Sequence, residues 1–89
     1  MSEDFKIQRM QIIHYLYQEY WKKNNHEFIQ LDQILEGVKK YCKLEENIFI
    51  GHILYLVEKG LIKPETMYYD TNNIYSVRIT AQGTDFYEN

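Results

Sequence analysis

The chain has 89 residues, 45 % of them apolar and 16 % aromatic, and a formal net charge of −3, which together predict one small domain over residues 1–89 with a single core. Its one cysteine, Cys42, excludes an internal disulfide, and its longest nearly apolar run, residues 48–57, is far shorter than the ~20 residues that a membrane-spanning helix needs. We therefore expect a cytoplasmic protein with no membrane contact.

The first predicted helix covers residues 5–24. Its apolar side chains recur with helical spacing at Met10, Ile13, Tyr17, Tyr20 and Trp21. Its last residues include two lysines, which suit a helix carboxyl end. Ile12, Tyr15 and Leu16 make the apolar face wider than the surface helix of a small monomer needs. We therefore expect a second buried contact at this helix, as in a homodimer.

A very short strand and a second helix follow. Phe28 and Ile29 form the expected strand, and the second helix covers residues 31–42. Apolar residues in that helix follow i, i+3, i+4, i+7 spacing at Leu31, Ile34, Leu35, Val38 and Tyr41 or Cys42. Gly37 inside this helix costs up to about 1 kcal/mol against alanine, so it marks either a close helix contact or a neutral accident.

The third predicted helix runs from about Glu46 to Lys59 and ends at Gly60. Glycine is the residue that most readily takes the left-handed conformation that closes helices. Residues 61–63 are expected to leave as extended chain, because Pro64 prevents the helix from resuming. The stretch LVEKGLIKPE therefore predicts a helix end followed at once by a strand.

A β-hairpin is expected next, with strands at residues 66–70 and 74–80 joined by residues 71–73. The asparagines of that turn tolerate the positive φ that a tight turn requires. Apolar and polar side chains alternate along the second strand, with Tyr75, Val77 and Ile79 on one face and Ser76, Arg78 and Thr80 on the other.

A short closing helix is expected at residues 81–89, with Thr80 as its N-cap. Threonine suits this position because its hydroxyl oxygen can accept a hydrogen bond from a backbone N–H of the first turn. The helix is expected to return Phe86 or Tyr87 to the core.

Two junctions carry a resemblance to a known family. LVEKGLIKPE, residues 56–65, is similar to the end of the recognition helix and the first wing strand of many bacterial and archaeal winged-helix regulators. RITAQGTDFYE, residues 78–88, is similar to their junction between the last strand and the final helix. Together with the element order, the chain resembles the winged helix-turn-helix family, which includes small bacterial, archaeal and phage regulators. The resemblance implies an α+β, mostly helical fold with a three-helix core, a two- to three-stranded wing and a short C-terminal helix.

The resemblance also implies DNA binding by a homodimeric transcriptional regulator. In that family the third helix enters the major groove and the wing tip contacts the adjacent backbone or minor groove. The candidate DNA-binding residues are Lys39, Lys40, Lys43, Asn47, His52, Tyr55, Lys59, Asn72, Asn73 and Arg78. The lysines either hold a phosphate strand or are solvated charges at helix ends, and His52 is either a base contact or a packed imidazole.

The distribution of charge along the chain supports an alternative function as strongly as the resemblance supports DNA binding. Residues 1–44 carry seven Lys or Arg and six Asp or Glu, whereas residues 45–89 carry three and seven, so the half that would approach DNA is the acidic one. On the outward face of the third helix, Ile48, Gly51 and Tyr55 form a low-charge patch of the kind that marks protein interfaces. The alternative is a winged-helix protein–protein interaction module that does not bind DNA.

Patterns for catalysis or metal binding do not occur in the sequence. The soft ligand residues are His14, His26, His52 and Cys42, and none of them forms a pair with metal-ligand spacing. Cys42 continues the apolar stripe of the second helix, which favours a small buried hydrophobe over a nucleophile. The glycines are isolated, so no phosphate-binding loop is present. We expect neither enzyme activity nor a metal or cofactor.

Overall fold

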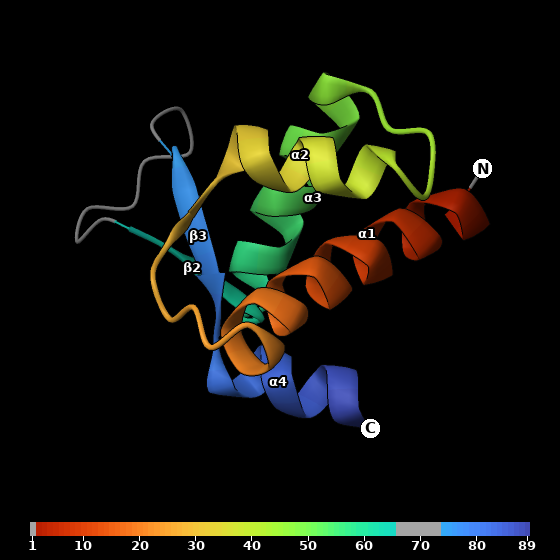
Figure 1. Cartoon of the computed structure of the whole chain (residues 1–89). Helices are drawn as coiled ribbons and strands as arrows, with labels where there is room; N and C mark the ends of the chain where they lie inside the picture. The colour runs from red at the N-terminus through yellow and green to blue at the C-terminus, as the bar shows by residue number, and fades with distance from the viewer. Residues whose placement is uncertain (1, 66–73) are drawn as a thin grey trace.

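The computed structural model describes residues 2–65 and 74–89 and has a mostly helical α+β fold (Figure 1). In chain order the elements are α1 (Ser2–Tyr17), η1 (Gln18–Lys22), β1 (Ile29–Gln30), α2 (Leu31–Lys39), α3 (Glu46–Glu58), β2 (Ile62–Pro64), β3 (Ser76–Ile79) and α4 (Ala81–Glu88). The η1 segment is a π-helical turn that continues α1. The expected α+β, mostly helical class is confirmed.

The three strands form one antiparallel sheet in which β3 lies between β1 and β2. Ile29 of β1 is paired with Val77, and Lys63 of β2 is paired with Arg78. The sheet lies at one edge of the helices, and α4 lies against the second half of α1 (Figure 1). The β3 strand therefore connects the short strand before α2 with the strand that follows α3.

One apolar core joins the helices and the sheet. Its most deeply buried side chains are Ile12, Ile13, Leu16, Ile34, Val38, Phe49, Ile53, Leu56, Ile62 and Val77. They come from α1, α2, α3 and two strands, so each of these elements has an apolar side facing the others. Full burial of one such side chain contributes about 1.5–3 kcal/mol, which makes this cluster the main source of stability.

The wide apolar face of α1 is used within the chain, because α1 packs against α2, α3, β3 and α4. Tyr15 lies so close to Gly37 of α2 that a methyl group at Gly37 would overlap the Tyr15 ring. The Tyr17 ring packs on Tyr87 of α4 with centroids 4.4 Å apart. Of the two explanations for Gly37, the close helix contact is therefore correct. The wide apolar face of α1 is thus covered without a second copy of the chain, and the homodimer stays a prediction.

The end of the first helix differs from the expected one. The α-helix stops at η1, and the chain then turns at Asn24, whose φ is 57°. A π-helical turn holds more residues than an α-helical turn, so side chains in η1 leave the phase of the α1 stripe. Trp21, which was expected on that stripe, is 51 % exposed and donates its Nε1–H to Thr84 Oγ1 at 3.0 Å.

The second helix is shorter than expected, and the first strand is displaced by one residue. The α2 helix ends at Lys39, and the next residues form a turn in which the Tyr41 N–H donates to the Val38 carbonyl at 2.9 Å. Tyr41 is exposed, because this turn carries it out of the α2 stripe. The β1 strand begins only after Phe28, since pairing with β3 starts at Ile29.

The alternation expected for residues 75–79 is wrong at two positions. Tyr75 precedes β3 and is 73 % exposed, whereas Ser76 is buried. Ser76 lies at the start of the central strand, and its buried hydroxyl donates to Glu65 Oε1 at 2.6 Å. The expected partner strand at residues 66–70 and the turn at residues 71–73 lie outside the described residues.

The end of α3 closes as the sequence predicts. Gly60 has a φ of 76°, and its N–H donates to the Val57 carbonyl at 3.0 Å. The Leu61 N–H donates to the Leu56 carbonyl, also at 3.0 Å. These two bonds are a Schellman closure, which uses otherwise unpaired carbonyls at the helix end. The chain then enters β2 directly.

Thr80 ties this helix end to the start of α4. Its side-chain oxygen accepts from the Gly83 N–H at 2.9 Å, as expected of an N-cap, and its hydroxyl donates to the Gly60 carbonyl at 2.6 Å. The Thr80 N–H donates to the Leu61 carbonyl at 3.1 Å, and a methyl group at Gly83 would overlap that carbonyl oxygen. We call Gly60, Leu61, Thr80 and Gly83 the α3–α4 joint.

Replacing Gly83 by alanine is expected to lower the free energy of unfolding by roughly 1–3 kcal/mol, because the added methyl group meets the backbone of Leu61. Gly51 is the matched control: no atom lies within 4 Å of the added methyl group, so Gly51→Ala is expected to raise that free energy by up to about 1 kcal/mol. Urea unfolding followed by circular dichroism measures both. A Gly83→Ala chain as stable as wild type would contradict the close contact.

Candidate functional site

His52 lies inside the protein rather than on the outward face of α3. It is 4 % exposed, its Nε2 is 2.7 Å from Gln8 Oε1, and the Phe5 ring meets it edge-on. A buried imidazole is badly placed to reach a base, which favours the packed-imidazole explanation over the groove contact considered for His52. Burial lowers the pKa of His52, and the nearby Arg9 charge lowers it further.

The outward face of α3 instead exposes Asn47, Gly51, Tyr55 and Glu58. Ile48, expected in the partner-binding patch, is half-buried and packs against the core. Gly51 adds open surface without a side chain. Of the expected patch, Tyr55 is therefore the side chain that is both large and exposed.

The three lysines at and after the end of α2 do not form one surface. All are exposed, but Lys39 and Lys43 line one shallow hollow, together with the carboxylate of Glu45, whereas Lys40 lines a different hollow with Lys23. Of the three, only Lys39 and Lys43 therefore lie beside the same hollow, between the end of α2 and the start of α3.

The remaining wing candidates are outside the described residues or already engaged. Asn72 and Asn73 belong to the part of the chain that the structure does not describe. Arg78 donates from Nη1 to the His26 carbonyl at 3.1 Å, and its guanidinium lies 4.9 Å from the Phe28 ring centroid. Its charge therefore faces the segment before β1.

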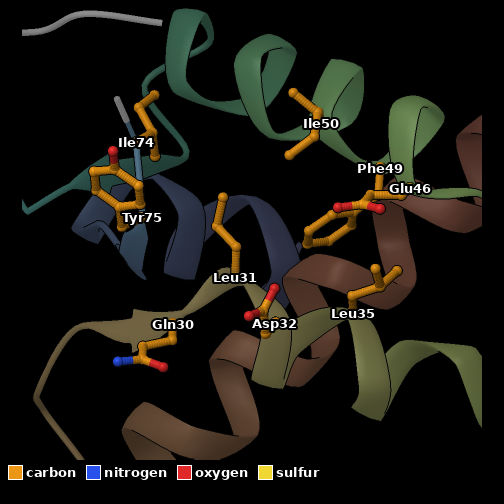
Figure 2. A pocket seen from close by; sticks show the side chains of 9 residues that line it. All are labelled: Gln30, Leu31, Asp32, Leu35, Glu46, Phe49, Ile50, Ile74 and Tyr75. Atoms are coloured by element: carbon orange, nitrogen blue, oxygen red, sulfur yellow. The ribbon is translucent and has the colours of Figure 1, made fainter. Parts of the chain in front are cut away.

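One flank of α3 carries an acidic groove of about 470 Å³, between α2, α3 and residues 74–75 (Figure 2). Its walls include the apolar Leu31, Leu35, Phe49 and Ile50. Its charged lining residues are Asp32 from α2 and Glu46 from α3, and both are carboxylates. A phosphate backbone on this flank would meet negative charge and no compensating lysine or arginine from the groove lining.

The opposite flank of α3 carries a second groove, of about 400 Å³, between α1, α3 and α4. Its charged lining residues are Lys6, Arg9 and Lys59, all cations. Among the described residues, none of these three cations forms an ion pair with a carboxylate within 4 Å. We call this site the cationic groove.

Apolar side chains form most of the cationic groove between its charges. Met10 and Ile13 come from α1, Leu56 from α3, and Leu61 from the α3–α4 joint. Phe86 of α4 also lines the groove and is 49 % exposed. Of the two aromatic residues expected to return α4 to the core, Tyr87 packs against it and Phe86 does not.

Tyr55 lies between two of the cations. The Arg9 guanidinium is 4.4 Å from the Tyr55 ring centroid and the Lys59 ammonium is 5.6 Å from it, while the residue stays 42 % exposed. Both contacts are cation–π interactions. Sequence reasoning found Tyr55 and Lys59 but missed Arg9 and Phe86, because nothing in the sequence shows that α1 and α4 meet beside α3.

The side chains that could ligate a metal ion are not grouped in the described part of the chain. Among the described residues, no group of three or more His, Cys, Asp or Glu side chains could hold a metal ion. Cys42 is half-buried, and burial raises the pKa of its thiol, which lowers the thiolate fraction. None of the helices in the described ranges has the length and apolar character needed to cross a membrane.

Comparison of the chain with protein-family models, curated proteins and solved structures finds no match.

His52 predicts a pH dependence of stability. Its pKa is lowered in the folded chain, so the unfolded chain binds the proton more readily, and stability present above the ordinary histidine pKa of about 6.5 is lost as the pH falls below it. The free energy of unfolding of wild type is expected to fall between pH 7.5 and 5.5, and that of His52→Gln to fall less. Urea unfolding at both pH values measures this. Equal slopes for the two chains would contradict the prediction.

Proposed function

We propose that the chain is a winged-helix domain that acts by binding a protein partner through the cationic groove. The winged-helix part is supported by the element order α1, β1, α2, α3, β2, β3 and by the three-stranded antiparallel sheet. It is supported further by the α3–α4 joint, which forms at the two junctions on which the family resemblance rests.

The observation that carries the protein-binding proposal is the composition of the cationic groove. Exposed aromatic rings beside an apolar surface mark protein interfaces, and Tyr and Arg are enriched where binding energy concentrates. Here Tyr55, Arg9 and Phe86 line one groove. Arg9 already lies on the Tyr55 ring, so binding requires little further ordering of either side chain.

The surfaces around α3 support DNA binding less well. Direct reading of bases uses Arg, Lys, Asn and Gln side chains, and the exposed face of α3 offers Asn47 near its start and Lys59 just past its end. His52 is buried and Arg78 faces the His26 segment. The acidic groove adds two carboxylates on one flank.

Site-specific photo-crosslinking tests the protein-binding proposal. With p-benzoylphenylalanine in place of Phe86, an extract of cells that encode the chain is expected to give one discrete adduct. The matched control places the same group at Tyr41, which is exposed but lies at the turn after α2, and is expected to give no such adduct. The adduct should also disappear when Tyr55→Ala is added, since this change removes the exposed ring on which the Arg9 guanidinium lies. No discrete adduct at position 86, or the same adduct at both positions, would contradict the proposal.

A second candidate function is DNA binding by a homodimeric transcriptional regulator, and one observation favours it. Lys39 and Lys43 are exposed together at the turn that leads into α3, where a winged-helix domain can hold a phosphate strand. Glu45 in the same hollow opposes them, so this contact is expected to be weak.

Anisotropy of a labelled mixed-sequence 30-base-pair duplex tests this second candidate. If the lysines bind phosphates, wild type binds at low salt, and a Lys39→Glu/Lys43→Glu chain loses affinity and shows a shallower dependence on salt. The control is Lys6→Glu/Lys22→Glu, which makes the same charge change at two exposed lysines of α1 and η1. Equal losses in both chains would show a general charge effect and contradict a site at the turn.

A further inference from the structure

The three cations of the cationic groove form an ordered set. Lys6 and Arg9 are three residues apart on α1, which places them on one side of that helix. Lys59 follows the last residue of α3 as its C-cap. All three line the same groove, and no described carboxylate lies within 4 Å of them. The described lining therefore offers positive charge from two directions.

Arg9 is the cation best placed to bind a carboxylate. Its guanidinium is held 4.4 Å from the Tyr55 ring centroid, which limits the positions that the side chain samples. Guanidinium groups bind carboxylates through two parallel hydrogen bonds and can do so while stacked on an aromatic ring. Lys6 and Lys59 are exposed, so they add attraction without fixed geometry.

The lining between the cations suits aliphatic side chains. Met10, Ile13, Leu56 and Leu61 supply aliphatic surface, and Phe86 is a half-exposed ring. Methionine adapts to partners of different shape. A nucleic acid would place polar bases on this surface, and Arg9 already occupies one face of the Tyr55 ring. The lining therefore favours apolar side chains over bases.

The backbone around the groove favours a helical partner. The lining residues belong to α1, α3, α4 and the joint, and the Leu61 N–H and C=O are both bonded within the chain. None of the described lining residues belongs to a strand, so the described lining offers an extended peptide no strand to pair with. A helix satisfies its own backbone groups and can present apolar side chains at i, i+3, i+4 and i+7.

From these observations we infer that the cationic groove binds an amphipathic helix of a protein partner whose apolar face is flanked by Asp and Glu side chains. This inference rests on the proposed protein-binding function and names the chemistry of the partner. Apolar side chains of that helix lie on Met10, Ile13 and Phe86, and one carboxylate pairs with Arg9.

Three labelled 16-residue helical peptides test the inference by fluorescence anisotropy against the full chain. All carry the same leucine face, and the flanking positions are Glu in the first, Gln in the second and Lys in the third. The Glu peptide is expected to bind at least about tenfold more tightly than the Gln peptide at low salt, and its advantage is expected to shrink as salt rises. The Lys peptide is expected to bind weakest.

Two charge variants and one control connect binding to the groove. Arg9→Gln and Lys6→Glu are each expected to reduce the preference for the Glu peptide, whereas Lys22→Glu, at the far end of η1, is expected to leave it unchanged. Lys6 is exposed, so Lys6→Glu tests the charge even if Arg9→Gln disturbs the packing around His52. Circular dichroism checks that each variant folds.

The outcomes separate this inference from the function on which it rests. Equal binding of the Glu and Gln peptides, with a discrete crosslink at position 86, would overturn the acidic partner and leave the protein-binding function standing. No binding of any peptide, with no crosslink, would overturn both. Tighter binding of a labelled single-stranded oligonucleotide than of the Glu peptide, lost in Arg9→Gln, would overturn the inference in favour of a nucleic acid.

Discussion

The hydrogen bonds of Thr80 at the α3–α4 joint are the constraint on which the rest of the surface depends. One threonine oxygen closes the end of α3 through the Gly60 carbonyl and starts α4 through the Gly83 N–H. Because Gly83 has no side chain, α4 can approach the Leu61 backbone closely enough to complete this joint. The joint therefore sets the direction in which α4 leaves the sheet and so the position of Phe86.

The cationic groove exists because three elements far apart in the chain meet at this joint. The α1 helix supplies Lys6 and Arg9, α3 supplies the tyrosine that contacts Arg9, and α4 supplies an exposed ring. On the other flank of α3 the carboxylates of Asp32 and Glu46 face the acidic groove (Figure 2). One helix thus separates surfaces of opposite charge, and a partner that recognises one flank is repelled by the other.

The sequence predicted the helix ends that depend on only a few neighbouring residues. Gly60, Thr80 and the spacing within α2 and α3 set helix ends that the structure confirms, apart from the last turn of α2. Sequence periodicity did not predict the position of two side chains. His52 is buried because Gln8 and Phe5, far from it in the sequence, cover it. Trp21 leaves the apolar stripe of α1 because the π-helical turn changes the helical phase. The groove could not be predicted, since no periodicity reports that α1 and α4 are neighbours.

Polar contacts hold much of α4 to the rest of the chain, and this has a consequence for the energetics of the groove. His14 Nδ1 lies 2.5 Å from the Tyr87 hydroxyl, and the Tyr17 hydroxyl donates to Glu88 Oε2 at 2.6 Å. Such a helix can detach locally while the three-helix core stays intact. Detachment removes Phe86 from the groove, so any occupant of the groove also resists that detachment. A ligand that occupies the groove is then expected to slow amide hydrogen exchange in α4, because both depend on the same equilibrium between attached and detached α4.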